Sequence, residues 1–264
     1  GMNLWWSDSD LLGGSTITMD GASMILTDPT HANTPGQSSD VFVKWRSAMT
    51  GSNVVIKNFN SLNLLCTTTN GGCVFINRQG NMASSSTFTI KDCSFNMNLP
   101  STGSINAGLE LASGTITSST LTVSNVAITA TTSSSCKANF LFVISSSVGT
   151  GGVVVFDQLS LNADAAVVGQ RALSIVSDLS GDASMSLTNS VASINAPNGN
   201  HAGVFSVGGG HTMSGTSTLL IDSNNVYMTG RTQNNSPLML GYDVRDSSTV
   251  TISNNLFDNA ASPI

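Results

Sequence analysis

The sequence has few charged residues and no long apolar run, and both shortages narrow the possible functions. Only 9% of the 264 residues are charged and Glu110 is the one glutamate, whereas about 25% is typical of soluble domains. The nine lysines and arginines are scattered and the net charge is −6. This argues against nucleic-acid binding, which needs a basic patch. No apolar run approaches the ~18 residues of a membrane span. Polarity from Ser, Thr, Asn and Gly favours an extracellular or cell-surface protein.

Cysteine and histidine are also scarce, with four and three residues. None of the cysteines has metal-site spacing with a histidine, so we predict no zinc site. Cys66 and Cys73 flank a segment that ends in Gly-Gly. Two alternatives stay open for them: a loop disulfide between the two, or no such disulfide. Cys93 is expected to be a small buried residue.

What the chain does have is one short pattern, repeated along almost its whole length. Alternating apolar residues are followed by Asn or Asp, as in Val54–Asn58, Phe88–Asp92 and Val250–Asn254. The last residues of the units are separated by 37, 34, 33, 32, 32, 34 and 31 residues. A period in this range marks a repeat architecture.

Alternation with period two in runs of Val, Ile, Thr and Phe predicts strands. Each unit also has a second apolar run, such as Val74–Ile76, so stacked units would bury one continuous core. We therefore predict an all-β, right-handed parallel β-helix of about eight coils with roughly 33 residues per coil. A propeller is the main rival, but its blades need ~40–50 residues. One residue per coil should form a buried column: Ile56, Ile90, Val123, Val155, Leu187, Ile221 and Ile252.

The Asn and Asp residues that end the units are expected to stack as a structural ladder at a left-handed turn. Its members would be Asn58, Asp92, Asn125, Asp157, Asn189, Ser223 and Asn254. The alternative is that these residues merely mark turns.

The two ends are expected to differ. Residues 1–13 are interpreted as a tag scar, since Gly1 precedes Met2, followed by a cap in which Trp5 and Trp6 plug the first coil. Residues 14–264 are expected to form one β-helix domain. No cap is visible at the C-terminus, so we expect the chain to be a fragment of a longer protein or to pack there against another chain.

The paired strands and the Asn turn column resemble the pectin-lyase-like superfamily of right-handed β-helices, over about residues 14–260. That family includes polysaccharide lyases, glycoside hydrolases, adhesins and non-enzymatic surface proteins. The Ser-, Thr- and Asn-rich coils also resemble large repetitive surface proteins of trypanosomatid protists. The resemblance rests on the repeat, because the polygalacturonase-like motifs are absent. Calcium would be expected only if the chain were a lyase, and otherwise we predict no cofactor.

An enzyme of this superfamily remains one alternative, with weak candidate residues. One group is Arg171, Asp178 and Asp182, and a second is Asp243 and Arg245. His211 follows three glycines and is the nearest approach to a family histidine motif. Each set is more typical of surface ion pairs and turns than of an active site.

The favoured expectation is a non-catalytic adhesive or binding module. Outward positions of the second strand would form an apolar contact stripe for carbohydrate, another protein or a second copy of the chain. Its apolar members would be Phe42, Phe75, Leu141, Phe205 and Met239. The alternative is that another part of the same chain covers them.

Ice binding is the third hypothesis, since some β-helices use Thr-any-Thr arrays for it. Outward threonine pairs are expected at 16/18, 87/89, 120/122 and 249/251. The pairs Asn53/Val55, Gly152/Val154 and Thr218/Leu220 interrupt the array. The high β-propensity of threonine explains the same residues.

Overall fold

A computed structural model of the chain describes residues 5–7, 9–21, 24–27, 38–65, 70–99, 104–132, 137–138, 141–163, 171–195, 203–229 and 236–259. Every element among them is a β-strand, and every strand pairing is parallel. No helix that is long and apolar enough to cross a membrane occurs in this part of the chain.

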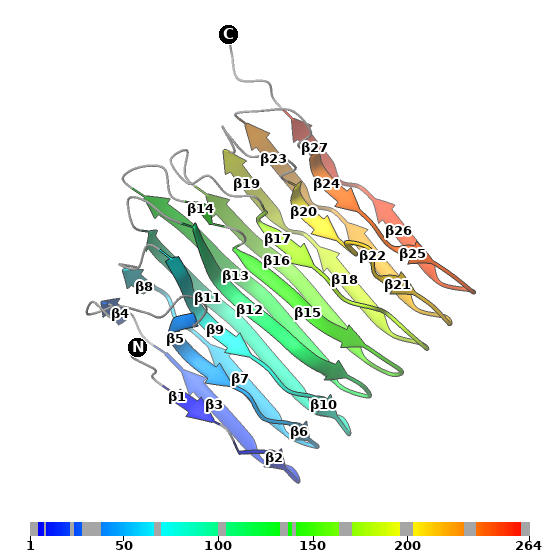
Figure 1. Cartoon of the computed structure of the whole chain (residues 1–264), viewed down its shortest axis with the longest axis horizontal. Coiled ribbons are helices and arrows are strands. Elements are labelled where there is room, and N and C mark those ends of the chain that lie inside the picture. Colours follow the sequence, from blue (N-terminus) through cyan, green and yellow to red (C-terminus); the bar gives the residue numbers. More distant parts are fainter. Residues whose placement is uncertain are drawn as a thin grey trace.

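Two large sheets contain nearly all of the strands, and Figure 1 shows the strands of successive repeats lying side by side. The first sheet follows the order β1 (Trp5–Ser7), β5 (Ser38–Trp45), β9 (Asn70–Arg78), β12 (Ser104–Ile116), β15 (Phe142–Val148), β17 (Leu173–Ile175), β20 (Gly203–Val207) and β24 (Ser236–Leu240). Short strands join it beside this path: β2 (Leu11–Leu12), β6 (Met49–Thr50), β10 (Met82–Ala83) and β14 (Lys137–Ala138).

The second sheet follows the order β3 (Thr16–Asp20), β7 (Asn53–Lys57), β11 (Thr87–Leu99), β13 (Thr120–Thr132), β16 (Val153–Ala163), β18 (Ser184–Thr188), β22 (Thr218–Asp222) and β26 (Thr249–Ser253). Beside it lie β4 (Met24–Thr27), β8 (Leu62–Leu65), β19 (Val191–Asn195), β23 (Asn225–Thr229) and β27 (Leu256–Asn259). A small separate sheet pairs β21 (Thr212–Met213) with β25 (Asp243–Val244).

The all-β class, the parallel sheets and the repeat of about 33 residues per turn are confirmed. The count of about eight coils is not: a β-solenoid of about five turns is supported, although each large sheet has eight strands along its main path. Segments outside the described residues interrupt the repeats, so the number of strands on a path does not count complete turns.

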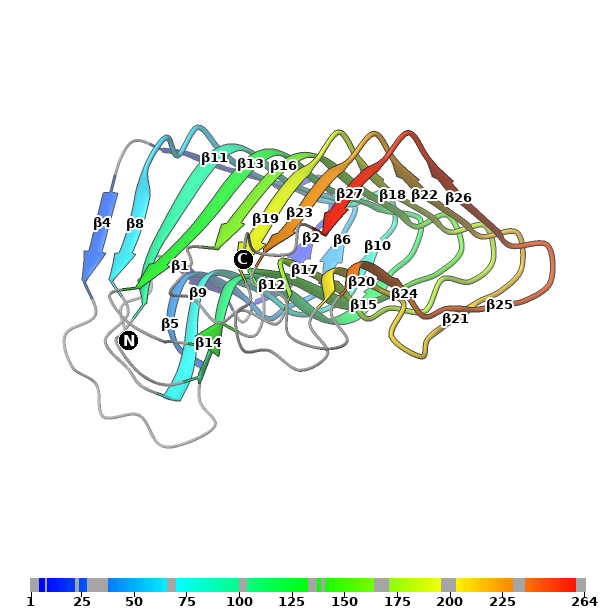
Figure 2. The same cartoon turned by 90° about the horizontal axis from the view of Figure 1, so that it is seen from above.

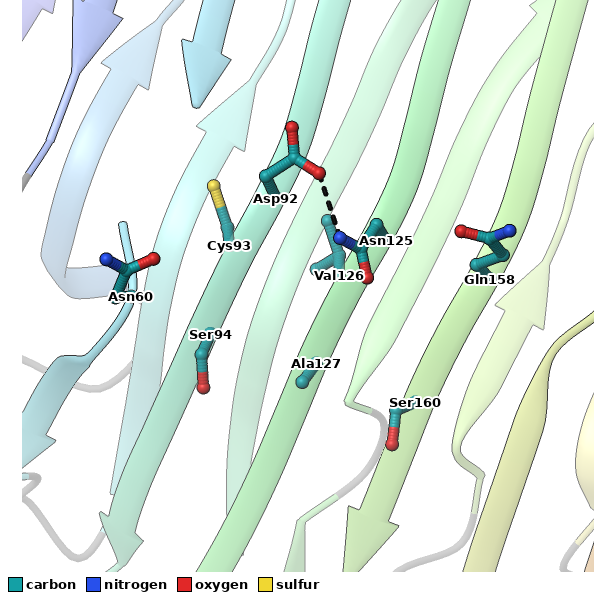
Figure 3. Close-up of a pocket in the computed structure, with 9 residues that line it drawn as sticks. All are labelled: Asn60, Asp92, Cys93, Ser94, Asn125, Val126, Ala127, Gln158 and Ser160. Atoms are coloured by element: carbon teal, nitrogen blue, oxygen red, sulfur yellow. Dashed lines mark hydrogen bonds between the residues drawn. The ribbon is translucent and has the colours of Figure 1, made fainter. Parts of the chain in front are cut away.

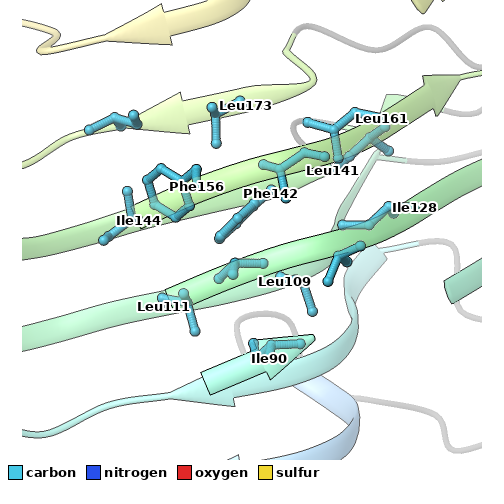
Figure 4. Close-up of a cluster of buried hydrophobic side chains, with 14 of the residues drawn as sticks. Ile90, Leu109, Leu111, Ile128, Leu141, Phe142, Ile144, Phe156, Leu161 and Leu173 are labelled. Carbon is cyan, nitrogen blue, oxygen red and sulfur yellow. The ribbon is translucent and has the colours of Figure 1, made fainter. Parts of the chain in front are cut away.

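The core lies between the two sheets, which form the two layers seen in Figure 2. Leu109, Leu111 and Phe142 from the first sheet meet Ile90 and Phe156 from the second in one buried cluster (Figure 4). The rings of Phe142 and Phe156 stand nearly perpendicular, with centroids 5.1 Å apart. Alternation along each strand sends every second side chain into this core.

The predicted buried column is correct for five of its seven residues: Ile56, Ile90, Val123, Leu187 and Ile221 are fully buried. Val155 was placed wrongly, because Val123 pairs with Phe156 and Val155 faces outward. Ile252 is in register with Ile221 but is 45% exposed, since β26 is the last strand of its sheet.

Arg78 is a charged residue at a core position. It lies in register between Trp45 and Leu111, both buried, and its guanidinium carbon is 5.9 Å from the centroid of the Phe88 ring. Its Nη2 donates to the carbonyl of Gly80 at 2.7 Å, while Nε and Nη1 have no partner among the described residues. Burial lowers the pKa of Arg78 to about 10.

The second sheet folds along a crest between β22 and β23, and at the equivalent place in the other repeats (Figure 2). One residue per repeat has a φ between 50° and 60° at this crest: Asn58, Asp92, Asn125, Gln158, Asn189, Ser223 and Asn254. We call these residues the crest column. Six of them are the predicted ladder residues, and Gln158 stands where Asp157 was expected because β16 is shifted by one residue.

The crest is tied together by aspartate–asparagine pairs instead of a continuous amide ladder. In each pair the asparagine amide donates to an aspartate of the preceding repeat: Asn58 to Asp20, Asn125 to Asp92, Asn189 to Asp157 and Asn254 to Asp222, at 2.8–2.9 Å. Aspartate and asparagine therefore alternate along the sheet. This order keeps carboxylates out of neighbouring strands, where like charges would repel.

From the hydrogen bonds at Asp222 we predict how the stability of the folded protein declines in acid. Ser253, Ser223 and Asn254 donate to Asp222 and hold its pKa below the usual value. A lowered folded-state pKa adds stability above the unfolded value of about 3.9, and this stability is lost as pH falls through the folded pKa. Asp222→Asn should lower the urea midpoint at pH 7 and flatten its decline between pH 5 and pH 2.5.

The matched control is Asp258→Asn, on an exposed side chain of β27 for which the described residues offer no hydrogen-bond partner. This variant should leave both the midpoint and its acid limb unchanged. Equal effects of the two substitutions would show that the crest bonds do not carry the acid sensitivity.

Candidate functional site

A shallow groove on the outer surface of the second sheet is the candidate site in the described part of the chain (Figure 3). It crosses β11, β13 and β16 just beyond the crest and holds about 270 Å³. Its lining residues are Asn60, Asp92, Cys93, Ser94, Asn125, Val126, Ala127, Gln158 and Ser160.

The crest forms one wall of the groove. Asp92, Asn125 and Gln158 each occupy the left-handed conformation, which turns the chain and points these three side chains out from adjacent strands. Asn125 Nδ2 donates to Asp92 Oδ1 at 2.8 Å, which fixes the two side chains relative to each other. The Gln158 side chain has no hydrogen-bond partner among the described residues and is exposed.

The hollow itself comes from one small residue. Ser94, Ala127 and Ser160 are in register on three adjacent strands, so a methyl group lies between two hydroxyl groups. Val126, almost fully buried, completes an apolar floor beneath polar walls. Such a combination is typical of small-molecule sites, where a few polar groups fix the ligand's orientation.

The chemistry of the lining selects a class of ligand. Amides and hydroxyls supply both donors and acceptors, while Asp92 supplies the only carboxylate. No lysine, arginine or histidine lines the groove, so an anionic ligand would meet a carboxylate and no cation. The arrangement therefore suits a neutral ligand that carries many hydroxyl groups.

Cys93 lies on the groove floor as a free, buried thiol. Its Sγ is 3.0 Å from the carbonyl oxygen of Lys91. Burial, the main cause, raises the pKa of the Cys93 thiol to about 11. The sequence-based expectation of a small buried cysteine thus agrees with its place in the fold.

The first group of catalytic candidates is dispersed. Arg171 donates to Ser174 Oγ at 3.3 Å, while Asp182 accepts the backbone N–H of Gly151 at 2.5 Å. Asp178 accepts the backbone N–H of Thr212 at 2.9 Å. The three charged residues share no partner, and each has a structural role of its own.

Two close contacts do occur among the candidate residues taken together. His211 Nδ1 lies 3.2 Å from Asp178 Oδ1, a pairing that sequence reasoning missed because 33 residues separate the two. Asp243 and Arg245 form an exposed ion pair at 2.5 Å. Neither pair lines the groove. No group of three His, Cys, Asp or Glu residues that could hold a metal occurs in the described residues.

The predicted apolar contact stripe was wrong. Phe75, Leu141 and Phe205 are buried in the core, and only Met239 is exposed, at 37%. The register shifts between Gly108 and Leu109, so two successive residues, Phe75 and Ile76, both point inward. The side chain of Phe42 lies outside the described residues.

Two other predicted features also fall outside what the structure describes. They are the Cys66–Cys73 disulfide and the plug formed by the side chains of Trp5 and Trp6. The backbone of β1, which contains both tryptophans, pairs in parallel with β5.

A second distinctive surface lies on the other side of the crest. It consists of two outward rows on the main path of the second sheet, which we call the threonine face: 16/18, 53/55, 87/89, 120/122, 153/155, 184/186, 218/220 and 249/251. None of these sixteen residues is charged, and nine are threonines. The shift in β16 makes Val153/Val155 the outward pair, while Gly152 and Val154 are buried.

Comparisons with protein-family models, curated proteins and solved structures found no match to this chain. The arguments about function therefore rest on the groove and the threonine face.

From the buried position of Cys93 we predict that its thiol is alkylated slowly. Raising a thiol pKa from 9.0 to about 11 lowers the thiolate fraction at pH 8 about 100-fold. Cys93 in the folded protein should therefore be alkylated by iodoacetamide at least about 100-fold more slowly than in urea, as measured by peptide mass spectrometry. Alkylation at equal rates in the two states would contradict the buried position of this thiol.

Proposed function

We propose that this chain is a non-catalytic, extracellular or cell-surface binding module whose groove holds a neutral carbohydrate. The observation that carries the proposal is the groove itself, with an apolar floor at Val126 and Ala127 between polar walls. The unpartnered side chain of Gln158 and the hydroxyls of Ser94 and Ser160 are placed to bond sugar hydroxyl groups. Adhesion follows if the carbohydrate belongs to another surface.

The groove offers little support for catalysis. Glycoside hydrolases use two carboxyl groups ~5–9.5 Å apart, but Asp92 is the only carboxylate in the lining. A lyase needs a basic residue, and the lining contains none. The alternative reading, a polysaccharide lyase or hydrolase, would have to use residues remote from this groove, and calcium belongs only to that reading.

The proposal includes a finer description of the fold. We take the solenoid to be a right-handed parallel β-helix, like those of the pectin-lyase-like superfamily. Parallel strands joined by a crossover are right-handed in about 98% of cases.

The threonine face favours a second candidate function, ice binding. In register, its uncharged pairs continue through every strand of the path, including Val153/Val155 and Ser184/Ser186. Adjacent strands space these side chains ~4.8 Å apart. A regular, uncharged array of hydroxyl and methyl groups suits an ordered water lattice better than a flexible polymer.

One pair of substitutions on β13 separates the two functions. Ala127→Arg fills the groove, whereas Thr122→Arg places the same side chain on the threonine face; both positions are outward and half-buried. On an array of neutral and anionic glycans, the wild type should bind neutral glycans. Ala127→Arg should weaken this binding at least about tenfold, which is 1.4 kcal/mol, and Thr122→Arg should leave it unchanged.

Thermal hysteresis measured on the same three proteins tests ice binding: Thr122→Arg should abolish it, and Ala127→Arg should leave it unchanged. Binding of glycans that survives Ala127→Arg would refute the groove as the site. Turnover of a polysaccharide by the purified wild type would refute the non-catalytic assignment.

A further inference from the structure

Arg78 interrupts a column of the core that is otherwise apolar from β5 to β20 on the first sheet. The members of this column pair in register from one strand to the next: Trp45, Arg78, Leu111, Ile144, Ile175 and Val207. All of them are buried, and Arg78 itself is 0% exposed. Charged residues are almost never fully buried unless they are paired, so the guanidinium group needs partners inside the core.

The surrounding side chains and backbone satisfy only part of this guanidinium group. Its Nη2 donates to the carbonyl oxygen of Gly80 at 2.7 Å. The ring centroid of Phe88 is 5.9 Å from the guanidinium carbon, and an aromatic face at this distance attracts a cation. Nε and Nη1 are buried and find no acceptor in the described part of the chain. Buried donors without an acceptor destabilise the folded state.

No carboxylate neutralises the charge of Arg78 within the described core. The buried polar residues there are serines, Asn224 and Arg78, without an aspartate or a glutamate. Glu110 precedes Leu111 on β12, and alternation along the strand turns it away from the side that faces Arg78. Burial alone lowers the pKa of Arg78, to about 10, and no acidic neighbour opposes this shift. The group therefore remains charged at neutral pH.

These features select the chemistry of the missing partner. A charge in a medium of low dielectric constant is tolerated when it is both neutralised and hydrogen-bonded. A water molecule accepts hydrogen bonds but leaves the positive charge uncompensated. A small monovalent anion does both, whereas a dianion would leave a net negative charge in the core. The donor set of Arg78 therefore suits an ion of the size and charge of chloride.

We propose that Arg78 binds a chloride-sized monovalent anion inside the core, with Nε and Nη1 as the donors that hold it. The unfolded chain has no such site, because water hydrates the arginine there, so the anion stabilises the folded state by mass action. The proposal does not depend on the glycan groove. That groove lies on the outer surface of the second sheet, whereas Arg78 belongs to a core column of the first.

Urea unfolding at constant ionic strength tests the site when sodium chloride replaces sodium gluconate, whose anion is too large for the core. The wild-type midpoint should rise with chloride. Above the dissociation constant, each tenfold increase in chloride should raise the ratio of folded to unfolded protein about tenfold. Arg78→Met restores an apolar column and should fold, but its midpoint should not respond to the exchange of anions.

The matched control is Arg245→Met, which removes an exposed arginine that pairs with Asp243. This variant should respond to chloride as the wild type does. A wild-type midpoint that is independent of chloride, or an equal response in Arg78→Met, would overturn the proposal.

A crystal of the wild type grown in bromide gives a second test that requires no variant. An anomalous difference peak within hydrogen-bonding distance of Nε and Nη1 of Arg78 would place the anion directly. Density there without an anomalous signal would identify water as the partner and would contradict the proposal.

Discussion

The parallel register between neighbouring repeats is the constraint on which the rest of this structure depends. Each strand pairs in parallel with the equivalent strand one repeat away, so a residue's column determines whether it faces the core or solvent. A slip of one residue exchanges the two faces. The core cluster, the crest column, the groove and the threonine face are four consequences of a single alignment.

The crest shows how the register positions a functional surface. A left-handed residue turns the second sheet at the same place in successive repeats, and the side chains at this turn project from neighbouring strands. Asp92, Asn125 and Gln158 consequently line up as one wall, and the small Ala127 leaves a hollow beside them. Strands supply every lining residue except Asn60, which lies in the short connection between β7 and β8.

The architecture and most of the inward columns could be predicted, because the repeat fixes the period and alternation fixes the faces. Prediction failed where the alternation carries no information. The run Val153–Phe156 is apolar at every position, so only pairing with β13 reveals that Phe156 faces inward. The register shift at Gly108 likewise buries Phe75 beside Ile76, and no short sequence pattern reveals it. Gly108 has a φ of 103°, and a Cβ there would overlap the carbonyl oxygen of Leu141. Ser94, Gln158 and Ser160 were missed because the groove combines three repeats.

Disulfide mapping between β13 and β16, two neighbouring strands of the second sheet, tests the register most directly. Thr122 and Val155 are paired neighbours on the outer face, whereas alignment by sequence alone pairs Val123 with Val155. Neighbouring parallel strands bring Cα atoms within the 4.4–6.8 Å that a disulfide spans. Under mild oxidation, Thr122→Cys/Val155→Cys should form a crosslink that mass spectrometry detects, and Val123→Cys/Val155→Cys should not. The reverse result would contradict the register and, with it, the positions of the groove and the threonine face.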